Sequence, residues 1–233
     1  MLVLAAVTLL ALDRAGVAGP LRSAVGTALA PVQRSLGRVV GSSEGTDAVR
    51  LRAELAAARI DAATAAELRA LRLVAGATRV LPTRVVALAV LPGAQATATI
   101  GLGTGDGVQP GMTVIDGDGL VGRVRRAGPH ASVVLLAVDP TSAVGVRLAG
   151  SGEVGLCRGA GRRLRLQLRA PHARVAPRDA VVTGPAGATT YVPGLPVGRV
   201  RSVSRSTDGL LRSADVQPAV DFTALDLVGV LVP

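Results

Sequence analysis

The chain has 233 residues, of which 49% are hydrophobic and 18% are charged, and its formal net charge is +10 at pH 7. This length suits one or two domains with a buried core, and the hydrophobic content argues against intrinsic disorder. A single cysteine excludes an internal disulfide, and one cysteine with two histidines cannot build a structural zinc site. The only aromatic residues are Tyr191 and Phe222, which argues against recognition of sugars or single-stranded nucleic acid by ring stacking.

Residues 1–12 form an uncharged apolar run that stops at Asp13. A twelve-residue helix is about 18 Å long, whereas the hydrocarbon core of a bilayer is about 30 Å thick. Three interpretations compete: a buried helix, the apolar region of a signal peptide, and a transmembrane helix whose beginning precedes the sequence. No basic region precedes the run, and no A-x-A-like cleavage site directly follows it. We therefore expect residues 1–19 to be a truncated membrane anchor, with the natural sequence starting upstream.

Residues 20–46 are expected to be a juxtamembrane amphipathic segment and a linker. Within 20–40, apolar residues recur at three- to four-residue steps with arginine and glutamine between them. Such a helix either lies along anionic lipid headgroups or is an ordinary surface helix. The small polar run 41–46 then serves as a flexible connector.

Residues 47–76 are rich in Ala, Leu, Arg and Glu, which predicts a helix that ends near Gly76. Leucines recur at heptad-like spacing in two stretches that do not share one register, because continuing the first places Arg69 in the seam. A coiled-coil homodimer and a solitary spacer helix both fit, and we favour the dimer. The candidate dimerisation residues are Leu51, Leu55, Leu68 and Leu71.

From residue 83 to 233 the pattern changes to short Val/Leu runs between clusters of Gly, Pro, Asp and Ser. Strands at roughly 8–12-residue spacing with turn signals between them predict an all-β sandwich or barrel. The segment Gly119-Leu-Val-Gly-Arg-Val124 is echoed by Gly194-Leu-Pro-Val-Gly-Arg-Val200. This internal repeat predicts a two-part β-domain made of two related modules.

These residues resemble the MreC family, the rod shape-determining protein C family. The resemblance spans essentially the whole chain, in the order anchor, helix and two-part β-domain. It is carried by four segments: 103–114, 119–124, 132–139 and 193–200. The last is the most specific. The chain departs from the family pattern at Pro177-Arg178-Asp179, where a Gly-Asp pair is more usual, and at Thr183-Gly184-Pro185, which replaces a Thr-Ser-Gly type of turn.

The resemblance implies a mainly β fold with two small β-barrel-like subdomains after the anchor and the helix. It also implies a single-pass protein of the cell membrane with its β-domain extracytoplasmic. Such a scaffold organises peptidoglycan synthesis and cell shape in the elongation complex. Its implied partners are MreD, MreB and cell-wall synthases (class B penicillin-binding protein), with no cofactor and no nucleic acid. The arginine-only, asparagine-free composition is typical of a GC-rich genome, and we expect an actinobacterial source.

The alternative function is a secreted or anchored hydrolase with a trypsin-like β-barrel fold. Such an enzyme needs a His–Asp–Ser set, usually with Gly-Asp-Ser-Gly around the nucleophile, and that sequence does not occur. His130 and His172 each follow a proline in a turn and are expected in exposed loops, and Cys157 is expected to be a buried strand thiol. We therefore expect no catalytic, cofactor-binding or metal-binding residue.

One strand offers a candidate surface for an anionic partner. In residues 163–169 leucines alternate with polar residues, so Arg163, Arg165 and Arg169 share the face opposite the leucines. Only Asp179 offsets the arginines nearby in sequence. An unopposed row of guanidinium groups favours anionic partners such as lipid headgroups, wall polymers or acidic protein surfaces, although a solvated outer face explains it equally well.

Overall fold

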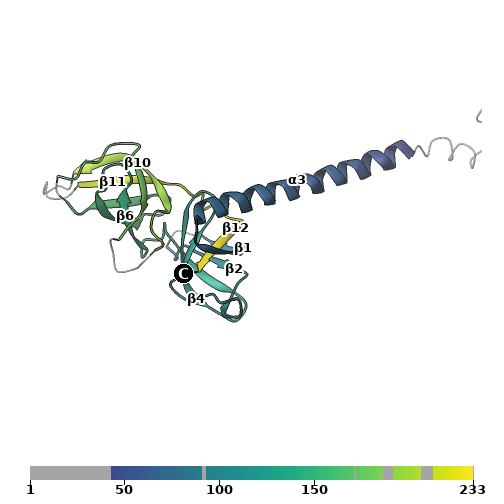
Figure 1. Cartoon of the computed structure of the whole chain (residues 1–233), viewed down its shortest axis with the longest axis horizontal. Coiled ribbons are helices and arrows are strands. Elements are labelled where there is room, and N and C mark those ends of the chain that lie inside the picture. Colours follow the sequence, from purple (N-terminus) through teal and green to yellow (C-terminus); the bar gives the residue numbers. More distant parts are fainter. Residues whose placement is uncertain (1–42, 91–92, 171, 186–190, 206–211, 233) are drawn as a thin grey trace, which may run out of the picture. The chain divides into compact units, whose positions relative to one another are not determined.

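The computed structural model describes residues 43–90, 93–170, 172–185, 191–205 and 212–232 (Figure 1). The chain divides into two compact units, Met1–Ile60 and Asp61–Pro233. The expected anchor at 1–19 and residues 20–42 of the juxtamembrane segment lie outside the described residues. Within the described part, no helix is both long enough and apolar enough to cross a membrane.

Helix α3 runs from Ser43 to Ala75. It ends where the sequence predicts, and the N–H of Gly76 donates to the carbonyl oxygen of Arg72 at 3.1 Å. Its start is four residues earlier than predicted, so the segment expected to be a linker is helical from Ser43 onward. Serine and acidic residues suit both a linker and a first helical turn, and composition alone does not separate the two.

The β-domain consists of two closed six-stranded barrels (Figure 1). The first barrel contains β1 (Arg79–Ala89), β2 (Thr97–Ile100), β3 (Thr113–Ile115), β4 (Leu120–Ala127), β5 (Ser132–Leu136) and β12 (Leu227–Val232), with the short 3-10 helix η1 (Thr104–Asp106) between β2 and β3. The second barrel contains β6 (Ala143–Leu148), β7 (Val154–Gly159), β8 (Leu164–Leu168), β9 (Ala180–Thr183), β10 (Pro196–Arg205) and β11 (Arg212–Pro218). The predicted two-part, mainly β fold is confirmed.

The two barrels have the same strand arrangement after a circular permutation. Around the first barrel the order is β1-β12-β3-β4-β5-β2, and around the second it is β10-β11-β8-β7-β6-β9. If β12 is counted as the opening strand of the first barrel, the two orders coincide, and β4 corresponds to β10. The chain therefore leaves the first barrel after β5, completes the second barrel, and returns to close the first with its last strand.

The sequence repeat falls on these corresponding strands. Val-Gly-Arg-Val lies on β4 at residues 121–124 and on β10 at residues 197–200. A Cβ atom at Gly122 would overlap the carbonyl oxygen of Leu135, and one at Gly198 would overlap that of Gln217. Both repeats therefore need glycine because the neighbouring strand approaches too closely for a side chain. Each pair of strands also shifts register immediately after the repeat.

A second correspondence precedes β3 and β9. The N–H of Gly111 donates to the carbonyl oxygen of Val124, and the N–H of Arg178 donates to that of Val200, each at 2.7 Å. Both donors have a positive φ, 93° at Gly111 and 75° at Arg178. Arg178 lies in the segment where the family resemblance implied a Gly-Asp pair, and this arginine holds a left-handed conformation that disfavours side chains.

Alternating side chains fill the two barrel interiors. Buried residues of the first include Ile100, Val114, Ile115, Leu136 and Val230, and those of the second include Val146, Leu148, Leu164, Leu166 and Val181. Both aromatic side chains are also largely buried, Tyr191 being 3% and Phe222 7% exposed. Neither ring therefore forms an exposed stacking platform for a sugar or a base.

Candidate interaction surfaces

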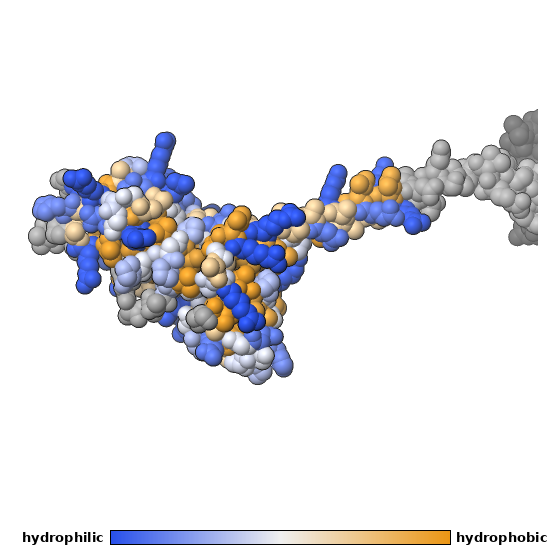
Figure 2. Space-filling model, viewed as in Figure 1, coloured by the Kyte–Doolittle hydropathy of each residue, from blue (hydrophilic) through white to orange (hydrophobic). Residues whose placement is uncertain are grey.

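The four leucines proposed for dimerisation have different surroundings. Leu51 is 58% and Leu55 50% exposed, Leu68 is half-buried, and Leu71 is only 1% exposed. Hydrophobic and charged residues both reach the surface along the described part of helix α3 (Figure 2). Leu51 and Leu55 are free to meet a partner, whereas Leu71 already belongs to the core of the β-domain.

Leu71 packs against the strand that closes the first barrel. A Cβ atom added at Gly229 in β12 would approach Leu71 Cδ2 to 2.9 Å, and one at Gly117 would approach Ala70 Cβ to 2.9 Å. Two glycines of the barrel thus leave room for the last turns of the helix. Leu71 is therefore covered within its own chain, and its place in a dimer seam stays a prediction. The second heptad-like stretch of the helix, which contains Leu68 and Leu71, faces the barrel. This explains why its leucine spacing does not continue that of the first stretch.

The arginine row on β8 has the predicted alternation. Leu164, Leu166 and Leu168 are buried, while Arg163, Arg165 and Arg169 are exposed. The row is not unopposed, however, because β11 pairs with β8 and places Asp215 opposite Arg165. Their Oδ1 and Nε atoms lie 3.9 Å apart. Sequence reasoning missed Asp215 because it comes from a strand about fifty residues further along the chain.

The structure adds Arg158 to the same outer face. Arg158 in β7 lies directly across from Arg165 in β8, so two like charges are neighbours on paired strands. Such a pair is destabilising in isolation and is relieved by an anion. Strongly hydrophilic residues project from the surface of this second barrel (Figure 2). Residues 140–220 contain twelve arginines and four acidic residues, whereas 79–139 with 221–232 contain five arginines and six acidic residues.

Asp139 has a structural role between the two barrels. Asp139 is buried, and its carboxylate accepts hydrogen bonds from Ala96 N at 2.6 Å, from Thr141 N at 2.8 Å and from the Thr141 hydroxyl. Although burial opposes its ionisation, these hydrogen bonds and the charge of Arg125 hold the pKa of Asp139 below its usual value. Asp139 therefore fastens the chain where it passes from the first barrel to the second.

His130 and His172 are both exposed in turns. Burial raises the pKa of the Cys157 thiol to about 12, so this strand cysteine stays protonated and unreactive at neutral pH. Among the described residues, His, Cys, Asp and Glu form no cluster that could hold a metal ion.

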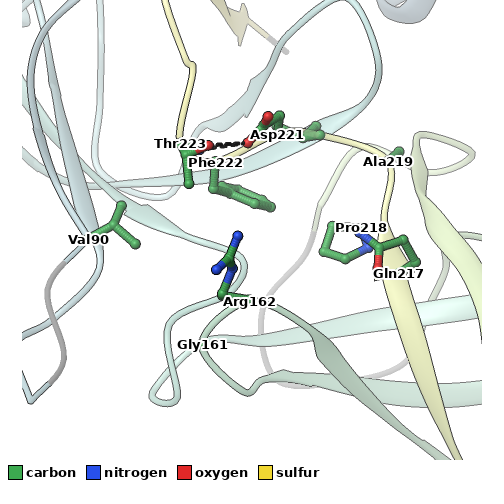
Figure 3. Close-up of a pocket in the computed structure, with 10 residues that line it drawn as sticks. Val90, Gly161, Arg162, Gln217, Pro218, Ala219, Asp221, Phe222 and Thr223 are labelled. Carbon is green, nitrogen blue, oxygen red and sulfur yellow. Dashed lines mark hydrogen bonds between the residues drawn. The ribbon is translucent and has the colours of Figure 1, made fainter.

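The β7–β8 hairpin borders a pocket of about 330 Å³. Its lining includes Arg162 from the hairpin, Pro218 at the end of β11, Asp221 and Phe222 from the connection to β12, and Val90 after β1 (Figure 3). Sequence reasoning did not identify this pocket, because its lining residues extend from Val90 to Thr223 and lie far apart in the chain.

The described part of the chain is thus a long helix followed by two permuted six-stranded barrels. A family model described as "Rod shape-determining protein MreC, barrel core" matches residues 91–232. The chain belongs to the MreC family.

Solved structures agree with this assignment. A chain described as MreC superimposes with a TM-score of 0.64 at 26% identity, covering 73% of this chain and 98% of that one. MreC from Pseudomonas aeruginosa gives 0.60 at 27% identity, with 66% and 99% covered. MreC from Listeria monocytogenes gives 0.60 at 23% identity, with 81% and 94% covered. No curated protein sequence matches the chain.

Proposed function

We propose that this chain is a membrane-anchored scaffold of the cell-elongation machinery, which organises peptidoglycan synthesis and cell shape through protein–protein contacts and is not an enzyme. The observation that carries the proposal is the match of residues 91–232 to the barrel core of a rod shape-determining family. A related structure supports it: a complex between a penicillin-binding protein (PBP2) and MreC from Helicobacter pylori resembles this fold, with a TM-score of 0.51 at 14% identity.

In this proposal residues 1–19 anchor the chain in the cell membrane, 20–46 lie next to it, 47–76 pair two protomers, and 83–233 form the extracytoplasmic β-domain. The apolar run at 1–12 supports the anchor. One matched structure is described as the major periplasmic domain of the cell shape-determining filament MreC, which supports the location of the β-domain. The arginine-only composition supports a GC-rich actinobacterial source.

The proposed partners are a class B penicillin-binding protein, MreD and MreB. A scaffold needs separate surfaces for separate partners, and the chain offers two of different chemistry. One is the exposed apolar face of helix α3 at Leu51 and Leu55, and the other is the arginine surface of the second barrel at Arg163, Arg165 and Arg169.

Depletion tests the proposed function. In the source organism, loss of the protein should turn rods into round cells, and expression of the full-length protein should restore rod shape. A variant lacking the anchor should be expressed but fail to restore it. Normal rods after complete depletion would contradict the proposal.

Self-association is the second element to test. Leu51, Leu55 and half-buried Leu68 remain as seam residues, and burial of each leucine contributes about 1.5–3 kcal/mol. So few contacts support a micromolar dimer in solution, which confinement to a membrane would strengthen. Analytical ultracentrifugation should show that Leu51→Glu with Leu55→Glu shifts residues 43–233 toward monomer. The matched control is Leu73→Glu, which changes another exposed leucine of the same helix. If the double variant had the same mass in solution as the unsubstituted protein, the helix would act only as a spacer.

A further inference from the structure

The pocket beside the β7–β8 hairpin contains a cation whose donors are free. In Figure 3 the Arg162 guanidinium points into the pocket toward the ring of Phe222. Arg162 has no hydrogen bond or ion pair with any described residue. A guanidinium group presents five N–H donors in a planar fork that suits a carboxylate or a phosphate.

The carboxylate across the pocket, Asp221, is held by its own turn through its Oδ1 atom. Asp221 accepts hydrogen bonds from the Thr223 hydroxyl at 2.6 Å and from Thr223 N at 2.9 Å. These two bonds, and to a smaller extent the charge of Arg162, lower the pKa of Asp221. Asp221 is therefore ionised and engaged with its own turn, and it forms no ion pair with Arg162.

The hairpin extends this positive site along one side of the barrel. Arg163 follows Arg162 in the chain and is exposed, and Arg165 and Arg158 lie on the outer face of the paired strands β8 and β7. Asp215 opposes only Arg165, at 3.9 Å. A ligand bound to Arg162 in the pocket would therefore contact further arginines where it extends out of the pocket.

We infer that the β7–β8 hairpin binds an acidic peptide segment of a partner protein, with one carboxylate held by Arg162 beside Phe222 and others along Arg163 and Arg165. The inference rests on the proposed scaffold function and names the chemistry of one partner.

The shape of the site favours a peptide over other anions. The recess is lined by Val90, Pro218 and Phe222 as well as by Arg162, so it suits a chain that carries apolar and acidic side chains together. A bilayer surface is too broad to enter a pocket of about 330 Å³. A polyphosphate chain brings charge but nothing apolar to contact the half-buried Val90 and Pro218.

The binding test uses the full chain in detergent and two fluorescent twelve-residue peptides. Each peptide carries six glutamates, with leucines at the other positions in one and serines in the other. The Glu/Leu peptide should bind in a saturable way and more tightly than the Glu/Ser peptide. Arg162→Gln should weaken its binding about tenfold, which corresponds to one lost charge-assisted contact. The matched control is Arg147→Gln, an equal loss of charge at an exposed arginine of β6, and it should change binding less than twofold.

Three results would overturn the inference. Equal weakening by Arg162→Gln and Arg147→Gln would mean attraction by net charge alone. Equal affinity for the two peptides would mean that the apolar lining of the pocket does not contribute to binding. Tighter binding to phosphatidylglycerol vesicles or to long-chain polyphosphate, with the same dependence on Arg162, would assign the site to phosphate. Because Arg162 is exposed, the variant should keep its β-sheet circular dichroism. Any of these results leaves the cell-shape test intact, so the two proposals fail separately.

Discussion

The two barrels share one strand arrangement but differ in how the chain completes them. The second barrel is formed by the contiguous residues 143–218, so all its strands are available once that stretch exists. The first barrel is built from residues 79–136 and then lacks a strand until Leu227–Val232 pairs with β1 and β3. Two similar barrels therefore depend differently on each other, because unfolding of the second barrel turns about 90 residues into a loop within the first.

The barrels also differ on the outside. Their interiors are filled by the same Val, Leu and Ile side chains, but the second barrel carries twelve arginines against four acidic residues and the first five against six. The pattern of buried side chains sets the fold. The charge of the outer surface can differ between the two barrels and can select their partners.

Removal of β12 should have the largest effect. A chain ending at Asp226 lacks the strand that pairs with β1 over six residue positions, and it also loses Gly229, which Leu71 contacts. We expect hydrogen exchange to show lost protection in β1–β5 and in residues 68–75, with protection kept in β6–β11. Retained protection in the first barrel would show that it closes without its last strand.

The repeated glycines should give a large and asymmetric effect. Gly122→Ala and Gly198→Ala each force a Cβ atom against a carbonyl oxygen of the next strand, and should each cost at least about 3 kcal/mol. Gly122→Ala should disturb the first barrel alone. Gly198→Ala should weaken both, because closing a loop of about 90 unfolded residues costs the first barrel about 4 kcal/mol.

Gly150→Ala is the matched control for the glycine variants, since nothing lies within 4 Å of a Cβ atom there. Denaturant unfolding, followed barrel by barrel through hydrogen exchange, measures the result. Equal responses of both barrels to both substitutions would refute the asymmetry.

Leu71→Ala should destabilise only the first barrel. The side chain is 1% exposed, and replacing a buried leucine by alanine costs about 2–5 kcal/mol. Leu73→Ala, two residues further along, should change stability by less than about 0.5 kcal/mol because Leu73 is 82% exposed. Thermal unfolding of both variants measures the difference. Similar melting temperatures would mean that the helix end is not packed as described.

Arg178→Gly should have the smallest effect and the opposite sign. Arg178 has a φ of 75°, a conformation that costs a non-glycine residue about 1–2 kcal/mol, and its counterpart Gly111 has no side chain to strain. Glycine should therefore stabilise the second barrel by about 1 kcal/mol, and asparagine by less. Arg178→Gln removes the charge but keeps the strain, and should bring no gain in the denaturant midpoint. A gain with glutamine would assign the effect to charge.

Much of the β-domain follows from local sequence. The short Val/Leu runs between clusters of Gly, Pro, Asp and Ser correspond to strands, for example at β9 and β12. Cys157 was expected in a strand, and it lies in β7. The repeat at 119–124 and 194–200 correctly indicated two related modules, since close strand packing imposes the same glycine twice.

What depends on distant residues could not be predicted. Leu71 has the same local spacing as the exposed leucines, and only its contact with Gly229 shows that it packs inward. Asp215 opposes Arg165 because β11 happens to pair with β8. Likewise, no local pattern shows that the first barrel is closed by the last strand, because pairing between β1 and β12 joins residues about 150 positions apart.

The position of β12 has a consequence for synthesis. Chains grow at about 5–20 residues per second, and about 90 residues separate the end of β5 from the start of β12. The first barrel therefore waits roughly 5 to 20 seconds after its fifth strand is made, with β1 and β3 lacking the neighbour that will join them. Open strand edges of this kind recruit other chains. The earliest strands to be translated thus spend the longest time exposed to aggregation, and the final six-residue strand ends that period.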